Sequence, residues 1–493
     1  MSFQDLFPVD SLSVLQWQAM FPLLVLGAAS VLGLLVSPIP RAGRAFAFAS
    51  VSGGALLSLI GLSFMSFQDP VSVLDGVLYF DRSSQVFSFV ILAVTLGCCL
   101  LSVGFDKREH LVAELYPLMG FSAVGMIGLV SSRHLMMLFI SLELMSLAVY
   151  VLVSMQRRSA EAAEAGLKYF LLGGAASSVF LFGVTLLYGT TGTLELSALA
   201  QSAQGLWQGQ VPLLFALGLC LIAVGFLFKV GAFPFHSWVP DVYTGASTPV
   251  TGFMISGVKL AAVGLMLRLG AEIFALPGLL ESHGALSQVL SVVTALTLIV
   301  GSLLGLVQNN VKRMLAYSTI AHTGYLLLGF MALTVGGQAA AADAIASYSV
   351  IYAVMNLGCF AVLTLVNPEG HDDLMLKDLA GLGRSRPVLA FALSVFLLSM
   401  AGIPPTAGFF GKYYLFLSAV SSGHIALTVL AALASVVSAA FYIKPLVVMY
   451  MDQPQDGVSA PSPRWFGAGL VVAITLVLTV VLGMLPAWVS HLL

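Results

Sequence analysis

Charge is what this sequence has least of. Only 9% of its 493 residues are Asp, Glu, Lys or Arg, whereas 59% are hydrophobic. Soluble domains carry about 25% charged residues, so the composition excludes an ordinary soluble fold. The formal net charge of −2 gives no general attraction to nucleic acid. The first residues, MSFQDLFPVD, are acidic and lack the basic stretch that opens a cleavable signal peptide.

Cofactor motifs are equally scarce. The sequence has four cysteines, all in apolar runs, and none of them belongs to a C-x-x-C pattern or a Cys/His cluster: Cys98, Cys99, Cys220 and Cys359. Iron–sulfur, c-type haem and structural zinc sites are therefore unsupported, and we predict no metal site. Nucleotide binding is unsupported as well, because no G-x-G-x-x-G or Walker motif opens a helix after a strand.

Long apolar runs dominate the chain instead. A helix needs about 20 apolar residues to cross a bilayer, and continuous runs argue against the alternating strands of a membrane barrel. We predict an all-α polytopic membrane protein with about fourteen transmembrane helices. The predicted spans are 16–37, 45–67, 84–105, 111–130, 133–155, 164–189, 211–246, 248–272, 286–307, 313–334, 341–366, 388–423, 425–450 and 465–490.

Basic residues set the expected orientation, because cytoplasmic loops are enriched in Lys and Arg. Most of the 20 basic residues fall in or beside the loops that follow odd-numbered spans. This pattern predicts that those loops face the cytoplasm and that both termini are periplasmic. The residues concerned are Arg41, Arg44, Lys107, Arg108, Arg157, Arg158, Lys312, Arg313, Lys377, Arg384, Arg386, Lys444 and Arg464.

Two stretches share one spacing of ionisable residues. Arg133 lies ten residues before Glu143, and Lys312 lies ten residues before His322. Ten helical residues rise about 15 Å, which is half of a ~30 Å hydrocarbon core. Each pair thus places an anchor at one surface and an ionisable group near the midplane, and we expect the two stretches to be copies of one unit.

Two predicted spans are too long for one straight crossing. The runs 211–246 and 388–423 each exceed about 30 residues and contain prolines, which remove a backbone donor and clash with the preceding turn. We predict a broken helix in each, at Pro234 and at Pro404 and Pro405, with Pro234 aligned to Pro404.

These matches predict an inverted repeat. Each copy holds five spans, so the second copy enters the membrane from the opposite side, and matched broken helices in such repeats indicate the transport site. The predicted organisation is three N-terminal helices in 1–110, a first repeat in 111–274, an inverted repeat in 285–451, and a loop with the last helix in 452–493.

Buried ionisable residues are the candidate site. A charge in the bilayer core costs at least about 2.5–3.5 kcal/mol on insertion scales. Burial favours the neutral amine of a lysine over its ammonium form, and a nearby carboxylate favours the ammonium form again. A change in the partner of the carboxylate therefore changes whether the lysine holds its proton. In order, we expect an ion pair of Glu143 with Lys168, a carrier at Lys229, relays at Lys259 and His322, and an exit-side carrier at Lys412, with His236 and Lys312 as possible further relays.

Less specific interpretations exist for each residue. Any of these lysines is also compatible with a static ion pair or a snorkelling helix end, and His236 with a group that caps carbonyls exposed by the helix break. Asp241 is typical of a helix cap or a loop. Proton transfer is favoured over these alternatives because nothing in folding requires so many costly groups in the bilayer core.

The stretches that carry these residues resemble a known family, the antiporter-like membrane subunits of NADH:quinone oxidoreductase (respiratory complex I). They cover most of 111–451 and read LFISLELMSLAVYVLVSM, EAGLKYFLLGGAASSVFLFGVTLLYGTTGT, FKVGAFPFHSWVPDVYTGASTPVTGFMISGVKLAAVGLMLRL, NNVKRMLAYSTIAHTGYLLLG and LLSMAGIPPTAGFFGKYYLF. The resemblance implies that the family's proton-transfer residues match Glu143, Lys168, Lys229, Lys259, His322 and Lys412.

The resemblance also implies a proton-translocating subunit of a bacterial inner membrane that binds no cofactor itself. NADH, FMN, iron–sulfur clusters and quinone would be held by partner subunits, and the chain would contact other membrane subunits, the lipid bilayer and, through its neighbours, the peripheral arm. The main alternative is a subunit of a multisubunit sodium/proton antiporter, which shares the fold. A static membrane-arm scaffold and a solute transporter with the same repeat are further alternatives.

Overall fold

The computed structural model describes residues 13–39, 42–65, 69–103, 112–156, 159–206, 212–274, 285–333, 338–366, 374–453 and 466–485. This part of the chain is almost entirely helical and contains one two-stranded hairpin. In chain order the elements are α2 (Val14–Val36), α3 (Gly43–Ser63), β1 (Val71–Val73), β2 (Leu78–Phe80), α4 (Arg82–Ser102), α6 (Leu115–Val130), α7 (Leu135–Val153), α8 (Ala160–Thr191), α9 (Leu196–Leu206), α10 (Leu213–Val230), α11 (Trp238–Gly245), α12 (Thr248–Phe253), η2 (Met254–Val258), α13 (Lys259–Leu269), η3 (Gly270–Phe274), α14 (Ala285–Leu306), α15 (Val311–Ala332), α16 (Gln338–Val366), η4 (Leu376–Leu379), α17 (Leu382–Ser385), α18 (Pro387–Ala401), α19 (Ala407–Ser421), α20 (Ile425–Met451) and α21 (Phe466–Met484).

The predicted all-α membrane architecture is confirmed. Within the described ranges, eleven helices are long and apolar enough to cross a membrane, and α6 and α18 are apolar but shorter. α15 has 22 residues but is not among the eleven, and it carries several polar side chains. The count of fourteen crossings therefore stays a prediction.

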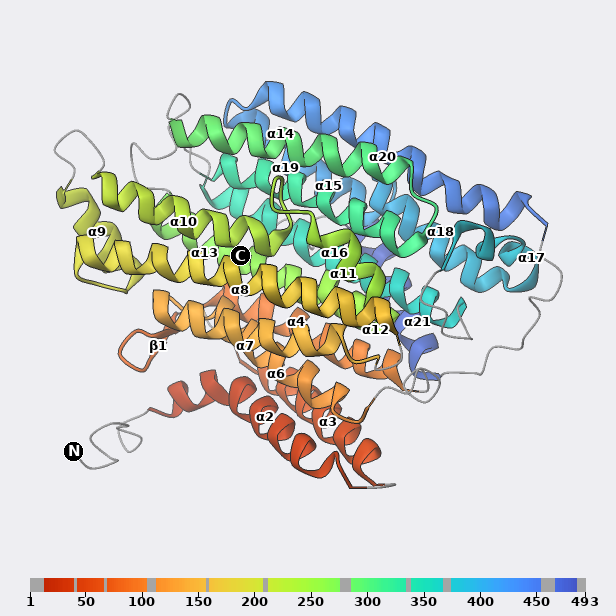
Figure 1. Cartoon of the computed structure of the whole chain (residues 1–493), viewed down its shortest axis with the longest axis horizontal. Helices are drawn as coiled ribbons and strands as arrows, with labels where there is room; N and C mark the ends of the chain where they lie inside the picture. The colour runs from red at the N-terminus through yellow and green to blue at the C-terminus, as the bar shows by residue number, and fades with distance from the viewer. Residues whose placement is uncertain are drawn as a thin grey trace.

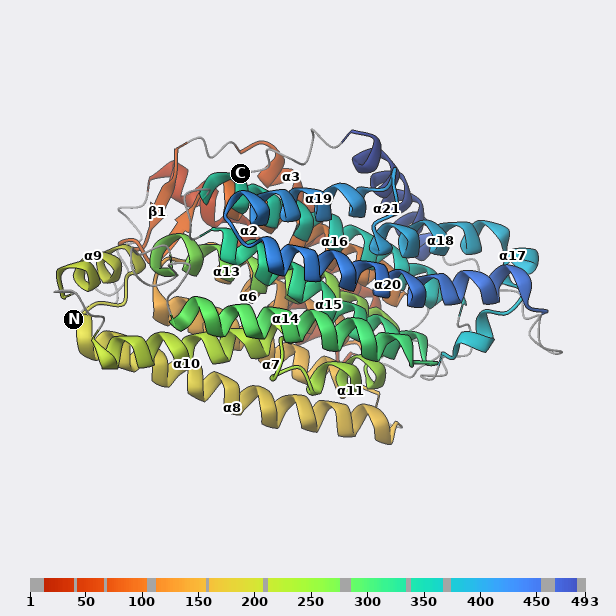
Figure 2. The same cartoon turned by 90° about the horizontal axis from the view of Figure 1, so that it is seen from above.

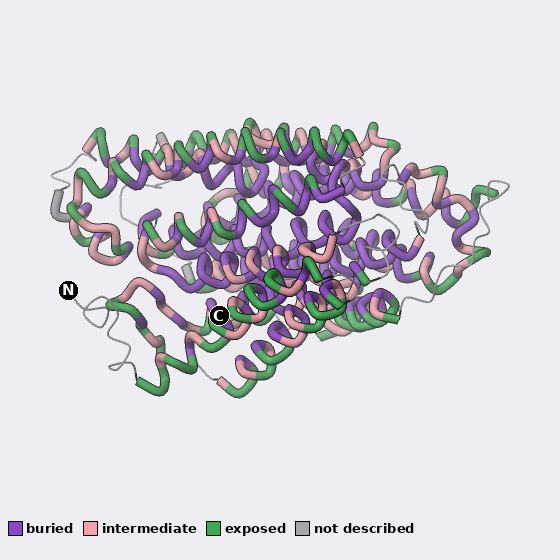
Figure 3. The backbone as a smooth tube through the Cα atoms, turned by 60° about the horizontal axis from the view of Figure 1, so that its bottom comes forward, coloured by how far each residue is buried: buried purple, intermediate pink, exposed green. Residues whose placement is uncertain are grey.

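The helices lie side by side along the long axis of the molecule, with α2 and α3 at one edge and α14 and α20 toward the other (Figure 1). In the turned view, α13, α15 and α16 lie between α8 on one side and α19 on the other (Figure 2). Buried residues concentrate on the inner helices, and exposed residues follow the outer ones (Figure 3).

Burial divides the helices into two classes. The span from α12 to η3 is buried throughout, and nearly every residue of α15 is buried. The outer helices instead expose large apolar side chains, such as Leu35 on α2 and Val436 on α20. Lipid solvates apolar side chains of this kind but does not stabilise a charged group. The ionisable residues Lys259 and His322 lie on the inner helices, away from that surface.

Both predicted helix breaks are present. α10 ends at Gly231 and α18 ends at Gly402, with backbone φ of 70° and 85°, a left-handed conformation that glycine adopts without strain. After Gly231, the Ala232 N–H donates to the Leu227 carbonyl at 2.9 Å, and after Gly402 the N–H of the next residue, Ile403, donates back in the same way at 3.1 Å. These are the bonds of a Schellman ending.

The matching endings correct the alignment of the two breaks. Because Gly231 corresponds to Gly402, Pro234 corresponds to Pro405 and not to Pro404. The residues around the prolines are similarly apolar in both alignments, so the sequence alone does not distinguish the two alignments. The one-residue shift also pairs Asp241 with Lys412, since each lies ten residues after its glycine.

A second pair of local structures corrects the other alignment. At the start of α7, the Leu135 N–H donates to Leu194 O at 2.8 Å, and at the start of α15 the Val311 N–H donates to Leu374 O at 2.8 Å. Counting along each helix from these bridges gives two equivalences, which are Glu143 with Thr319 and Ser146 with His322. The expected pairing of Glu143 with His322 is three residues out, because it matched charge types and not backbone geometry.

The hairpin was not expected from the sequence. β1 and β2 pair antiparallel, with Val71 opposite Phe80, and the hairpin ends at Asp81, the N-cap of α4. Its Tyr79 N–H donates to Ser131 O at 2.6 Å, which fixes the hairpin to the end of α6.

The repeat boundaries and the orientation stay predictions. The first and last residues, 1–12 and 486–493, lie outside the described ranges, as do the two linker segments 104–111 and 275–284. So do several of the basic residues on which the orientation rests: Arg41, Lys107, Arg108, Arg157, Arg158 and Arg464.

Candidate functional site

Lys229 occupies the last turn of α10, directly before the first helix break. Its side chain is only 6% exposed. The Nζ ammonium donates to Ser146 Oγ at 2.6 Å and to Tyr150 Oη at 3.5 Å, both on α7. It also lies 5.5 Å and 5.9 Å from the ring centroids of Tyr150 and Tyr169, distances at which a cation is attracted to a ring face.

Glu143 lies one turn before Ser146 on the same helix. Its carboxylate interacts electrostatically with Lys229 and with Tyr150. One carboxylate oxygen, Oε1, is buried and has no hydrogen-bond partner among the described residues. The carboxylate therefore lies within electrostatic reach of Lys229 but is not hydrogen-bonded to it.

The expected ion pair between Glu143 and Lys168 is wrong. Lys168 instead pairs with Glu164 at 2.7 Å and with Asp241 at 2.9 Å. The Glu164 contact follows from the i, i+4 spacing on α8. The Asp241 contact depends on how α11 packs against α8, which the sequence does not reveal.

Asp241 is more than the cap or loop residue expected from the sequence. One of its oxygens accepts from Lys168 on α8 and the other accepts from Arg313 on α15 at 2.9 Å. All three side chains are about one third exposed or more, so the group lies at a rim of the bundle, where α8 and α15 begin.

The first break is joined to the second half of the chain through its backbone. The Val230 carbonyl accepts from Thr323 Oγ1 of α15 at 2.7 Å, and the Phe233 N–H donates to Thr297 Oγ1 of α14 at 3.0 Å. A break leaves helix groups without intrahelical partners, and these two threonines satisfy two of them. α14 and α15 thereby hold the break in place.

Lys259 lies on the inner helix α13, directly after the π-helical turn η2. Single π turns inside helices are frequent at functional sites. The side chain is 4% exposed, and its ammonium donates to the Thr319 carbonyl of α15. Thr323 Oγ1, which bonds the Val230 carbonyl, also lies 3.1 Å from that Thr319 carbonyl, so Lys259 and Thr323 share one acceptor.

His322 is enclosed by tyrosines. Its Nδ1 is 2.5 Å from the hydroxyl of Tyr348 on α16, and its Nε2 is 3.0 Å from the hydroxyl of Tyr442 on α20. The ring also lies near Tyr325 and Tyr352, with centroid distances of 5.7 and 4.6 Å. Both nitrogens of the imidazole therefore face a group that can either donate or accept.

Lys412 lies in the first half of α19, just after the second break. Its ammonium donates to the Ala401 carbonyl at 3.0 Å and to Ser435 Oγ of α20 at 2.9 Å. The ammonium also lies 4.9 Å from the ring centroid of Tyr325. Since Tyr325 is one helical turn from His322, Lys412 and the histidine lie in one continuous polar region.

The two possible relays have different surroundings. Lys312 is almost fully buried, and its ammonium donates to the Ala246 carbonyl at 2.8 Å, at the C-terminal end of α11, where a cation is stabilised by the helix dipole. His236 is partly buried and stacks on Phe233 at a centroid distance of 5.5 Å.

The structure therefore brings most of the expected residues onto one polar axis. It runs from Glu143 and Lys229 past the Val230 carbonyl, Thr323 and the Thr319 carbonyl to Lys259, and then past His322 to Lys412. Lys168 lies off the axis, at the rim. Sequence reasoning missed the hydroxyl residues that join the axis, which are Ser146, Tyr150, Thr319, Thr323, Tyr348, Ser435 and Tyr442.

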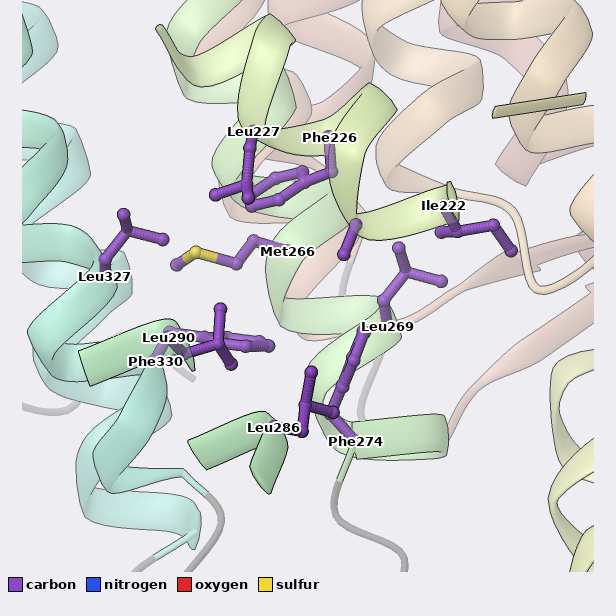
Figure 4. A pocket seen from close by; sticks show the side chains of 11 residues that line it. Ile222, Phe226, Leu227, Met266, Leu269, Phe274, Leu286, Leu290, Leu327 and Phe330 are labelled. Carbon is purple, nitrogen blue, oxygen red and sulfur yellow. The ribbon is translucent and has the colours of Figure 1, made fainter. Parts of the chain in front are cut away.

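A small apolar cavity lies beside the axis, between α10, α13, η3, α14 and α15. Its volume is about 20 Å³, and its lining is wholly apolar, including Phe226, Met266, Leu290 and Phe330 (Figure 4). Cavities with such linings stay dry. On the side of Lys229 that faces the beginning of α10, the polar axis is therefore bordered by apolar residues.

A charged cluster at the hairpin was also missed. Arg268 of α13 is 7% exposed and forms two bonds of 2.7 Å to the carboxylate of Asp81. Tyr79 lies between two guanidinium groups, those of Arg133 and Arg268, which are 3.5 and 5.7 Å from its ring centroid. Burial raises the pKa of Asp81, but Arg268 and the hydrogen bonds from Ser84 together outweigh burial and hold that pKa below its usual value.

Metal ligands do not gather in the part of the chain that the structure describes. No group of three or more His, Cys, Asp or Glu side chains there could hold a metal ion. The axis itself is built from lysine, carboxylate, imidazole and hydroxyl groups, all of which donate, accept or exchange protons.

Taken together, the fold and the axis define a multi-span membrane protein with two broken helices and buried, proton-exchanging side chains. The family model described as "NADH:quinone oxidoreductase/Mrp antiporter, TM" matches residues 132–438. The chain is 39% identical to NADH-quinone oxidoreductase subunit N of Trichlorobacter lovleyi, covering 90% of this chain and 86% of the relative. It is 37% identical to subunit N 2 of Rhizobium meliloti, covering 97% and 98%. The chain belongs to this family of membrane subunits, among relatives named NADH-quinone oxidoreductase subunit N.

Solved structures give the same picture. A chain of respiratory complex I from Thermus thermophilus with bound aureothin superposes with a TM-score of 0.80 and 36% identity, covering 95% of this chain and 98% of that one. A chain of the Mrp complex from Dietzia superposes equally well, with a TM-score of 0.82, but at 22% identity. The second likeness concerns the fold alone.

Proposed function

We propose that this chain is a proton-translocating membrane-arm subunit of an NADH:quinone oxidoreductase, in the position of subunit N. Electron transfer from NADH to quinone takes place in other subunits, and the energy released drives protons through this one. The observation that carries the proposal is the buried axis from Glu143 to Lys412, because nothing in folding requires so many ionisable groups at membrane depth.

The proposed route uses the groups in their spatial order. A proton enters near Glu143 and Lys229, passes Lys259 and His322, and leaves by way of Lys412, from the cytoplasm to the periplasm. Lys168 acts at the rim with Asp241 as its partner. Both termini are periplasmic, and the membrane is the bacterial inner membrane.

NADH, FMN, iron–sulfur clusters and quinone are assigned to partner subunits. The partners are the neighbouring membrane subunits and, through them, the peripheral arm. A multisubunit sodium/proton antiporter is the second candidate, because the Mrp complex shares the fold.

Assembly tests the proposal first. Mildly solubilised membranes that carry a tagged copy are run on a native gel and stained for NADH dehydrogenase activity. We expect the tag to comigrate with a large NADH-oxidising band. A tag confined to a smaller assembly without that activity would contradict the proposal and favour the antiporter.

Lys229→Arg then tests the mechanism. Arginine keeps the positive charge but does not release a proton near neutral pH, so we expect NADH-driven proton pumping in vesicles to fall by roughly tenfold or more, in the range of a lost acid–base group. Lys377→Arg is the matched control, because Lys377 is exposed on η4. A fully assembled Lys229→Arg complex that pumps like the wild type would refute the carrier role.

A further inference from the structure

One face of α20 carries three hydroxyl residues, Ser435, Ser438 and Tyr442, which we call the hydroxyl stripe. Their spacing of three and four residues places them on one side of the helix, over a rise of about 10 Å. Tyr442 is bonded to His322, and Ser435 is bonded to Lys412. The stripe therefore spans the distance between two ionisable groups that have no direct bond.

The bonding of the stripe differs from that of ordinary helix serines. Ser302 and Ser349 donate to the carbonyl four residues earlier on their own helices, at 2.6 Å each, which is the usual local solution. Ser438 instead donates across to Ser302 Oγ at 3.2 Å. Ser435 accepts from Lys412 at 2.9 Å and, as a donor, makes a long contact of 3.4 Å to Ala401 O of α18. These hydroxyls face side chains of other helices.

The His322 end is suited to passing a proton through. A neutral imidazole has one donating and one accepting nitrogen, and here each nitrogen meets a tyrosine hydroxyl, Tyr348 on one side and Tyr442 on the other. The Tyr442 hydroxyl also bonds Ser318. A proton taken up at one nitrogen and released from the other reaches the stripe with no movement of the ring.

Tyr325 occupies the middle of the gap. Its hydroxyl is buried and has no hydrogen bond of normal geometry to a described residue, although it lies close to Ser435 and Ser438. A buried, unsatisfied hydroxyl costs about 1–3 kcal/mol, which a purely structural tyrosine would avoid as phenylalanine. Its ring also lies under the Lys412 ammonium.

We propose that the hydroxyl stripe, together with the hydroxyl of Tyr325, conducts the proton between His322 and Lys412. His322 takes up a proton at Nδ1 and releases the proton on Nε2 to Tyr442, each hydroxyl accepts one proton as it passes its own on, and the neutral amine of Lys412 accepts the last at Nζ. No electron moves, and no hydroxyl changes its net charge. This inference rests on the proposed function and adds the residues that connect two of its carriers.

Tyr442→Phe and Ser435→Ala test the stripe, because each removes a hydroxyl and little else. In assembled complexes we expect NADH-driven proton pumping to fall by roughly tenfold in each variant, with a larger solvent deuterium isotope effect than in the wild type. A loss of packing alone would not raise that isotope effect. The double variant should pump no worse than the poorer single variant, since groups that act in series are not additive.

Two matched controls are available. Tyr116→Phe removes the hydroxyl of an equally buried tyrosine on α6, and Ser102→Ala removes a buried helix serine that bonds its own backbone at 2.8 Å. Pumping within the range of these controls in assembled Tyr442→Phe and Ser435→Ala would overturn the proposal. If Tyr442→Phe does not assemble, Ser435→Ala decides alone.

The two levels of inference fail in different ways. If Lys229→Arg stops pumping while both stripe variants pump normally, the stripe is wrong and the proposed function stands. If the tagged chain never joins an NADH-oxidising complex, the proposed function itself fails.

Discussion

We call the ion pair between Asp81 and Arg268 the clamp, and we predict that it stabilises the hairpin end of the bundle. Asp81→Asn keeps an oxygen that can accept from the Ser84 N–H, the capping bond of 2.8 Å at the start of α4. It removes the charge that faces the guanidinium of Arg268. Arg268 is 7% exposed, so it would remain as a buried cation without its carboxylate.

The magnitude follows from burial. Removing one partner of a buried pair costs about 3–5 kcal/mol. We expect about 3 kcal/mol, because the Asp81 side chain is 21% exposed and Arg268 keeps its bond to the Val130 carbonyl. That free energy corresponds to a roughly 150-fold larger opening equilibrium for the hairpin and the first turn of α4.

Hydrogen–deuterium exchange read by mass spectrometry measures this opening directly, in the protein embedded in lipid nanodiscs. Peptides that cover 78–88 should exchange roughly two orders of magnitude faster in Asp81→Asn. Asp75→Asn is the control, because Asp75 is an exposed turn residue of the same hairpin. Equal exchange in the two variants would refute the reasoning.

Two further predictions concern pH and the joint between the halves. Arg268 and the hydrogen bonds from Ser84 together hold the pKa of Asp81 below 3.8 against the effect of burial, so the clamp contributes fully above that pH and is lost only as the pH falls through the lower folded-state pKa. Exchange at 78–88, corrected for intrinsic rates, should therefore be flat from pH 7 to about pH 5 and rise only in stronger acid. A rise near neutrality would contradict the expected sign. Thr323→Val leaves the Val230 carbonyl without its 2.7 Å bond, which costs about 1–3 kcal/mol, and we expect NADH-driven pumping to fall. Thr364→Val is the control. It loses only a bond to its own helix and should leave pumping unchanged.

Much of the fold follows from apolar run lengths alone. A run of about 20 apolar residues forms a helix because every backbone group must be bonded inside lipid, and the prolines mark both breaks. The π turn before Lys259 and the hairpin are not visible in this way. Each depends on a local backbone arrangement that helix period and proline position do not encode.

The site shows the same division. The sequence identified the buried residues Lys229, Lys259, His322 and Lys412 because a charge in an apolar run is costly and therefore noticeable, although it missed the buried Arg268. It did not identify their partners, since Lys168 reaches Asp241 only through the packing of α11. Hydroxyl residues gave no signal, because serine and threonine are common in apolar helices and usually bond their own backbone, and a largely apolar ring such as that of Tyr442 is ordinary in a core.

The two broken helices are alike in backbone but opposite in charge. In the first broken helix, Lys229 precedes the break and the carboxylate of Glu143 lies within electrostatic reach. Asp241 follows Gly231 by ten residues. In the second, the lysine is at the position equivalent to Asp241, and the neighbour is His322. A repeat with the same charges in both halves would offer a proton the same environment from either side, and would give it no preferred direction. The backbones of the two breaks match but their charges do not, and a preferred direction of proton transfer would require such a difference between the two halves.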